Sequence, residues 1–197
     1  GEGDMPVIEP IPWDELPSEA RVMIEEGLSS GMYTTPVPMQ VMAYSSAALR
    51  SMHDAYRATF RRGLLEARLV ELLRLRSAEA GGCAPCMASR KDGSVTEDDV
   101  ACLVDPDPER FTPREVAALR FFDRLAFDHM SIDDGTYRAL HELFTTAEVV
   151  ELAYLCANSV GTHRFLHTLA FASNEPPVIQ YRSEEVDAGQ PTVGSQA

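Results

Sequence analysis

Apolar side chains recur at helical spacing along most of this 197-residue chain, and they are densest in the segment 64–80. Leu65, Leu69, Leu72 and Leu73 follow this spacing, while Leu64, Val70 and Leu75 lie on other faces. A helix that is apolar over most of its circumference is usually buried. The pattern therefore predicts a central helix here, with Glu71 as its conspicuous polar exception.

Further helices are predicted on both sides of this segment. They cover residues 18–28, 39–62 with a break near 47–50, 96–103, 112–128, 131–144 and 145–171. The firmest starts are two capping boxes, Thr112 with Glu115 and Thr145 with Glu148. Every segment with a clear period is helical, so the predicted fold class is all-α.

Composition divides the chain into three parts. Residues 1–17 are rich in glycine and proline at their start and are expected to form an extended arm, with Trp13 as its anchor. Residues 18–172 are predicted to form one all-α domain with two helical halves. Residues 173–197, which contain Pro176 and Pro177, are predicted to be a mobile tail.

The chain is strongly acidic, with 31 Asp and Glu residues against 17 Lys and Arg residues and a net charge of −14. Such a charge repels phosphate backbones and anionic membrane surfaces. The longest uncharged run, residues 27–49, contains Pro36 and Pro38 and is not typical of a membrane span. We therefore expect neither nucleic acid nor a membrane as a partner.

Cysteine usage indicates a reducing compartment. Cys102 and Cys156 stand alone in apolar surroundings, so the four cysteines do not form a secreted disulfide framework. No segment near the start is typical of a signal peptide. We therefore expect a cytoplasmic protein.

The other two cysteines form a Cys-x-x-Cys motif. Cys83 and Cys86 follow two glycines and enclose Pro85, a residue suited to the first turn of a helix. If a helix begins at Gly82 or Cys83 and continues to Arg90, its first-turn N–H groups favour a thiolate. Arg90, four residues after Cys86, is then on the same helical face and adds a cation. The thiolate is the reactive species.

Three interpretations of this motif remain open. The two glycines before Cys83, the proline at a helix start and the intracellular type of composition favour a redox pair. A structural zinc site needs four ligands, and no second closely spaced Cys or His pair follows. His163 and His167, one helical turn apart, are an alternative metal pair, but no Glu-x-x-His occurs in the chain. Two cysteines packed as small apolar residues are the third interpretation.

Glu71 has two interpretations. Arg68 and Arg74 lie three residues to either side, which suggests a solvated ion pair of little energetic value. The functional alternative is a carboxylate held beside the cysteines as a proton acceptor, with a pKa raised by apolar neighbours. Spacing alone favours the ion pair. His53, inside the 39–62 helix, is interpreted as a packed or surface residue, although histidine is readily recruited to proton transfer.

The residues 71–76, 82–86 and 93–100 together resemble the core of the carboxymuconolactone decarboxylase and AhpD-like alkylhydroperoxidase superfamily. A glutamate twelve residues before the first cysteine, the Cys-x-x-Cys motif, and then a glycine and an acidic helix start are the pattern of its peroxidase branch. The similarity is close over about residues 39–118, and the later helices resemble longer members. It implies an all-helical, homo-oligomeric thiol peroxidase or disulfide reductase with no cofactor or metal.

The resemblance also implies a role for each site residue. Cys86 is expected to attack the peroxide, Cys83 to resolve the product as a disulfide, and Glu71 to take part in a proton relay. The family usually has a histidine where this chain has Arg90, and arginine is not a base at ordinary pH. Electrostatic activation of the thiolate by Arg90 is one way to replace the missing histidine. A base from another helix, His53 or His163, is the other.

The expected substrate is a hydroperoxide, and the apolar helices suggest an organic one. A dithiol protein or a small thiol is the expected reductant. Two alternatives remain open at this stage: an adaptor that reduces a partner's disulfide without meeting peroxide, and a non-catalytic or metal-binding helical oligomer of the same fold.

Overall fold

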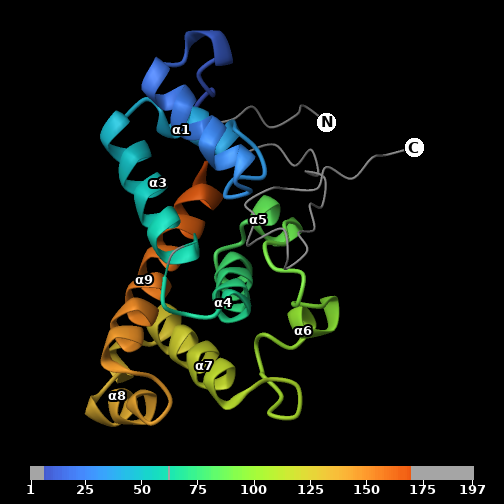
Figure 1. Ribbon diagram of the computed structural model, residues 1–197, viewed down its shortest axis with the longest axis vertical. Helices are drawn as coiled ribbons and strands as arrows, with labels where there is room; N and C mark the ends of the chain where they lie inside the picture. The colour runs from blue at the N-terminus through green and yellow to red at the C-terminus, as the bar shows by residue number, and fades with distance from the viewer. Residues whose placement is uncertain (1–6, 62, 170–197) are drawn as a thin grey trace.

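A computed structural model gives the positions of residues 7–61 and 63–169, and all regular structure in these ranges is helical (Figure 1). The α-helices are α1 (Ser18–Ser29), α2 (Val37–Met42), α3 (Ser46–Arg61), α4 (Ala67–Ala80), α5 (Ala84–Ala88), α6 (Glu97–Ala101), α7 (Pro113–Phe127), α8 (Asp134–His141) and α9 (Thr146–Thr168). Two short 3-10 helices are η1 (Trp13–Glu15) and η2 (His129–Ser131). The predicted fold class is confirmed over these residues. The predicted tail, 173–197, and residues 1–6 of the predicted arm lie outside them.

Helix α4 is central, as the leucine pattern predicts. All its residues from Leu69 to Ala78 are buried, and it packs against α7 and α9. Leu72 of α4, Leu119 of α7 and Leu152 of α9 are fully buried in the shared apolar core. Figure 1 shows α4 between α1 and α3 at one end of the molecule and α7 and α8 at the other.

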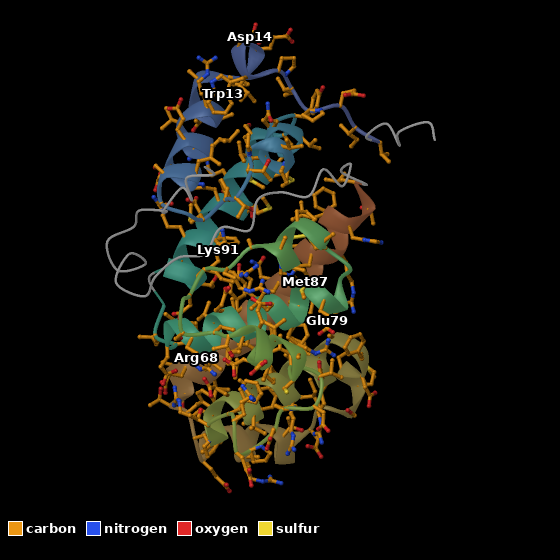
Figure 2. The ribbon with its side chains drawn as sticks, turned by 90° about the vertical axis from the view of Figure 1, so that its right-hand side faces the viewer. Trp13, Asp14, Arg68, Glu79, Met87 and Lys91 are labelled. Atoms are coloured by element: carbon orange, nitrogen blue, oxygen red, sulfur yellow. A yellow bond between two sulfur atoms is a disulfide. The ribbon has the colours of Figure 1, made fainter. Side chains whose placement is uncertain are left out.

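Helices α1, α2 and α3 enclose a second apolar cluster, in which Ile24 and Leu49 are fully buried. The arm is anchored to this cluster by Leu16, which is 4% exposed. The prediction that Trp13 is the anchor is wrong. Its side chain is 38% exposed near the outer end of the molecule (Figure 2), because the turn of η1 directs Leu16 inward instead.

The helix predicted over 39–62 is in fact two helices, α2 and α3, with the break at residues 43–45. The break falls earlier than predicted because Ser45 caps α3. Its hydroxyl oxygen accepts a hydrogen bond from the N–H of Ala48 at 3.3 Å, which satisfies a first-turn donor. Apolar spacing runs through this junction and so does not reveal it.

Both predicted capping boxes form. Thr112 and Glu115 begin α7, and Thr145 and Glu148 begin α9. Helix α9 is the longest, at 23 residues, and its predicted end near Phe171 lies outside the described residues. No helix in the described part of the chain combines the length and apolar character needed to cross a bilayer.

Candidate active site

The chain reaches the cysteines through a tight turn that requires both glycines after α4. Gly82 has a φ of 66°, in the left-handed region that disfavours side chains. A Cβ on Gly81 would lie 2.8 Å from the Cβ of His163, so α9 packs directly against the turn. The N–H of Cys83 then donates to the carbonyl oxygen of Ala78 at 2.9 Å. The turn therefore holds the cysteines against both α4 and α9.

Cys83 is the N-terminal cap of α5, and Cys86 lies in its first turn. The two are joined by a disulfide with their Cα atoms 5.3 Å apart, drawn as the yellow bond near Met87 in Figure 2. Cys83 is 3% exposed, whereas Cys86 is half-buried. The prediction that this helix reaches Arg90 is wrong, because α5 ends at Ala88 and the next residue is extended.

Arg90 consequently does not lie one turn below Cys86 on a shared helical face. Its guanidinium donates to both carboxylate oxygens of Glu97 at 2.9 and 2.8 Å, and to the carbonyl oxygens of Met87 and Ser89. The hydrogen bond from Arg90 holds the pKa of Glu97 below its usual value. The cation is therefore balanced by a carboxylate of α6, which weakens any effect on the thiolate.

A different arginine contacts the cysteine segment. Arg74 of α4 donates to the carbonyl oxygens of Cys86 and Ser89, both at 2.8 Å. The same guanidinium binds the two carboxylate oxygens of Glu71 at 2.6 and 2.8 Å, and each side chain is 2% exposed. The interpretation of Glu71 as part of a solvated ion pair is wrong, because the pair is buried. Arg68 is bound elsewhere, to carboxylates of α6 and α7.

Lys91 ties this segment to the amino-terminal helices. Its backbone N–H donates to Oε1 of Glu71 at 2.7 Å. Its Nζ donates to the carbonyl oxygen of Gly31, just after α1, also at 2.7 Å. Glu71 is thus the acceptor on α4 at which Arg74 and Lys91 meet.

A pocket of about 80 Å³ lies between the amino-terminal segment that contains α1, α2 and α3 and the helices α4, α5 and α9. Both cysteines are in its wall. Its wall is mostly apolar and mixes sulfur, aromatic and polar side chains, among them Met32, Tyr33, Met39, Met52, Tyr56, Arg74, Cys83, Cys86, Ser89, Lys91, His163 and Leu166. Methionine and aromatic side chains adapt to irregular organic groups. The wall therefore suits a compact organic ligand at the sulfur atoms.

His163 brings an imidazole to this pocket from α9. It is buried, and its Nδ1 lies 2.8 Å from the hydroxyl oxygen of Ser77. Burial, and then the charge of Arg74, lower the pKa of His163 to about 3, so the ring is neutral at pH 7. His167 binds the carbonyl oxygen of Gly82 at 3.0 Å. In residues 7–61 and 63–169, no three His, Cys, Asp or Glu side chains cluster as metal ligands.

His53 does not line the pocket but contacts a residue that does. Its ring is 2% exposed, and its Nδ1 lies 2.9 Å from the hydroxyl oxygen of Tyr33. Sequence reasoning missed Tyr33. The available signal is weak: an aromatic residue soon after Gly31, the glycine that ends α1.

The predicted site residues are thus only partly brought together. Cys83 and Cys86 lie in the pocket wall, Glu71 is bound to Arg74, and Arg90 is held by α6. Sequence reasoning treated Arg74 only as a surface partner of Glu71. Its i, i+3 spacing from Glu71 was the signal for the pair, but not for the contacts with the cysteine segment.

The helices and the cysteine turn define an all-α protein of the AhpD-like fold. An AhpD-core, peroxidase-related protein from Ralstonia eutropha JMP134 superposes with a TM-score of 0.69 over 84% of this chain and 91% of its own, at 20% identity. A peroxidase-related protein from Silicibacter sp. TM1040 gives 0.70 over 89% and 96%, at 15% identity. The debrominase Bmp8, in complex with 2,3,4-tribromopyrrole, gives 0.71 over 89% and 96%, at 12% identity. No protein-family model and no curated protein matches the chain. The resemblance stated from the motif is therefore confirmed at the level of the fold.

Replacing Arg90 tests whether its charge matters to the thiols. In Arg90→Met we expect the alkylation rate of reduced Cys86 by iodoacetamide to stay within about threefold of the parent, because Glu97 already balances the cation. The free energy of unfolding should fall by about 1–3 kcal/mol, since the buried Arg90 side chain also donates to the carbonyl oxygens of Met87 and Ser89. A tenfold fall in alkylation rate would return Arg90 to the site.

Proposed function

We propose that the chain is a thiol-dependent hydroperoxide reductase whose redox centre is Cys83 and Cys86. The observation that carries the proposal is that both cysteines line an apolar pocket while joined to each other as a disulfide. Cysteines that served only as small apolar residues would be expected to pack inside the core, away from a pocket. The AhpD-core and peroxidase-related neighbours share the fold in which this chemistry is proposed.

The first step oxidises Cys86. Its sulfur is the more accessible of the two, because Cys86 is half-buried and Cys83 is 3% exposed. The Cys86 thiolate attacks the terminal oxygen of the hydroperoxide, and the S–O bond forms as the O–O bond breaks. The products are a sulfenic acid on Cys86 and an alkoxide, which takes a proton and leaves as an alcohol.

The second step forms the disulfide. The sulfur of Cys83 attacks the sulfenic acid sulfur of Cys86, and the thiol proton leaves with the hydroxyl group as water. The two-electron oxidation of the dithiol balances the reduction of the peroxide. A dithiol protein or small thiol of the cytoplasm then restores both cysteines by thiol–disulfide exchange.

The pocket wall favours a thiolate through a cation. Lys91 lines the pocket, and a nearby cation stabilises the charged form of a cysteine, whereas Glu71 balances the charge of Arg74 as Glu97 balances that of Arg90. The first turn of α5 adds little, because the helix has only five residues. Lys91 thus takes over the electrostatic role expected of Arg90, and Arg74 holds the cysteine segment through its carbonyl oxygens.

His163 and Glu71 support the site in different ways. With a pKa of about 3, His163 is too weak a base to hold the thiol proton, so it orients groups through hydrogen bonds. Glu71 holds Arg74 and the N–H of Lys91 in place. A direct part of Glu71 in proton relay, as the resemblance implies, would add to this positioning role.

Thiol titration after addition of a hydroperoxide tests the proposal. The reduced protein should lose two thiols per equivalent of tert-butyl hydroperoxide, and a dithiol reductant should restore them. The apolar wall should make this substrate at least about tenfold better in kcat/KM than hydrogen peroxide. A preference for hydrogen peroxide would contradict the organic substrate class. Thiols that resist both peroxides but exchange with a dithiol partner would identify a disulfide reductase.

The debrominase neighbour supplies a comparison substrate for the same assay. A thiolate can attack a halogen as well as an oxygen, and the tyrosines of the pocket wall suit a flat ring. Release of bromide from 2,3,4-tribromopyrrole faster than peroxide consumption would reassign the substrate class.

Exposed apolar side chains support self-association as part of this proposal. Val150 and Tyr154 lie one turn apart on α9 and are 65% and 55% exposed. Such surfaces are typical of contacts between copies of a chain. A monomeric mass in sedimentation would contradict this.

A further inference from the structure

Three polar side chains connect the pocket to the surface through the amino-terminal helices. The hydroxyl oxygen of Tyr33, in the pocket wall, lies 2.9 Å from Nδ1 of His53. On the far side of the same ring, Nε2 of His53 lies 3.5 Å from Oε2 of Glu26. The side chain of Glu26 is 45% exposed, so it can exchange protons with solvent. The three side chains thus lie in a row between solvent and the cysteine pocket, joined by one hydrogen bond and one ion-pair distance of 3.5 Å.

The fold holds this chain of groups in place. The Tyr33 ring lies directly over Gly27, where a Cβ would come within 2.1 Å of it, and the N–H of Tyr33 donates to the Gly27 carbonyl oxygen at 2.9 Å. His53 is 2% exposed, and its Nε2 is buried without a hydrogen-bond partner among the described atoms, although Glu26 is within ion-pair reach. Leaving such an atom unsatisfied costs stability. The buried position of Nε2 of His53 therefore suggests a functional role for this atom.

The proposed peroxidase reaction has a step that needs a route for a proton. Cleavage of the O–O bond releases an alkoxide, a strong base that leaves readily only once it is protonated. Arginine does not give up its proton at ordinary pH, so Arg74 is not the donor. His163 is neutral, and Lys91 must keep its charge to favour the thiolate. Tyr33, also in the wall, has the imidazole of His53 2.9 Å from its hydroxyl oxygen, and this ring can resupply a proton.

We propose that Tyr33 donates the proton to the leaving alkoxide, and that His53 and Glu26 resupply it from solvent. This inference rests on the proposed function. As the alkoxide takes the proton of the Tyr33 hydroxyl, the tyrosine oxygen takes the Nδ1 proton of His53, and Nε2 of His53 takes one from solvent by way of Glu26. One proton moves in from solvent for each alcohol that leaves, and the net charge of the three side chains is unchanged.

The surroundings of Tyr33 suit a donor that stays protonated until an alkoxide forms. Burial, and then the nearby Tyr56, Glu26 and Asp54, raise the pKa of Tyr33 above its ordinary value. Arg57 donates to both carboxylates, at 3.2 Å to Glu26 and 3.4 Å to Asp54, which keeps Glu26 at the entrance of the route. The hydroxyl is therefore present as a donor throughout the neutral pH range.

The test compares two peroxides of similar size that differ in whether the leaving group needs a proton. Cleavage of tert-butyl hydroperoxide releases an alkoxide as the leaving group. Cleavage of peracetic acid releases acetate, which is stable as an anion at pH 7. In Tyr33→Phe, the single-turnover rate of thiol loss should fall by about 10²-fold with tert-butyl hydroperoxide. With peracetic acid it should change by less than about threefold, because no proton has to be supplied.

Further variants separate the relay from a packing role. Glu26→Gln should slow only the reaction with tert-butyl hydroperoxide. The matched controls are Glu25→Gln and Tyr44→Phe, at exposed residues, and both should leave the rates with the two peroxides unchanged. Tyr33→Phe with Glu26→Gln should be no slower than Tyr33→Phe alone, since both act in one route. Phenylalanine keeps the ring over Gly27, and thermal unfolding of the reduced variant checks the fold.

If the single-turnover rate of Tyr33→Phe falls equally with both peroxides, or falls with neither, the relay alone is overturned. A parent protein that consumes neither peroxide would overturn the proposed function, and the relay with it. We expect the rate to fall with tert-butyl hydroperoxide only, in both Tyr33→Phe and Glu26→Gln.

Discussion

Cys86→Ser is expected to lower the single-turnover rate with tert-butyl hydroperoxide by at least about 10³-fold, because a serine hydroxyl is not ionised at pH 7. Cys83→Ser should keep this first step within about threefold of the parent and accumulate a sulfenic acid, because only the resolving thiol is lost. The asymmetry follows from the pocket wall, where Cys86 is half-buried and Cys83 is 3% exposed.

A sulfenic-acid reagent with mass spectrometry distinguishes the two variants. Cys102→Ser is the matched control, because Cys102 is outside the described wall of the pocket and bears no disulfide. Trapping on Cys83 in the Cys86→Ser protein, with none on Cys86 in Cys83→Ser, would exchange the two roles. Full peroxide turnover in both single variants would remove the cysteine pair from the mechanism.

The parts of this site that could be predicted from the sequence are those set by local rules. The leucine spacing of α4 reports burial directly, and the capping boxes at Thr112 and Thr145 mark helix starts through contacts three residues apart. Gly82, before Cys83, is required by a local turn in which its φ is 66°. Each of these depends on few residues, so the sequence pattern is sufficient.

The charges around the cysteines could not be predicted in the same way. The expected role of Arg90 assumed that α5 continues, but side chains take the carbonyl oxygens of Cys86 and Met87, and the helix ends at Ala88. Arg74 reaches the carbonyl oxygen of Cys86 because α4 packs against α5, whereas Arg90 takes that of Met87. No spacing rule within one helix contains that information.

Tyr33 and His53 show a second limit of sequence reasoning. They belong to the amino-terminal cluster, and Tyr33 reaches the cysteines only because the loop after α1 folds over the pocket. A histidine inside an apolar helix is usually packed or exposed, and the sequence does not indicate which neighbour its ring meets. The hydrogen bond to Tyr33 is a tertiary contact between segments twenty residues apart.

The Glu71–Arg74 pair is the costliest polar interaction to break in this site. Both side chains are 2% exposed, and each charge is satisfied by the other and by the cysteine segment. Removal of one partner from a buried pair leaves an uncompensated charge, which typically costs about 3–5 kcal/mol. Helix α4 also carries a second pair at the same i, i+3 spacing, Arg76 with Glu79, in which the carboxylate is 42% exposed and the arginine is also bound by Asp123.

Glu71→Gln is therefore expected to lower the free energy of unfolding by about 3–5 kcal/mol, while Glu79→Gln should cost less than about 1 kcal/mol because Glu79 is 42% exposed. Urea unfolding of the reduced proteins measures both. Arg74→Met added to Glu71→Gln should recover part of the loss by removing the orphaned cation. Equal losses in Glu71→Gln and Glu79→Gln would show that burial gives the first pair no special weight. If Glu71→Gln instead lost peroxide turnover at unchanged stability, Glu71 would act directly in proton transfer, and its hold on Arg74 would be incidental.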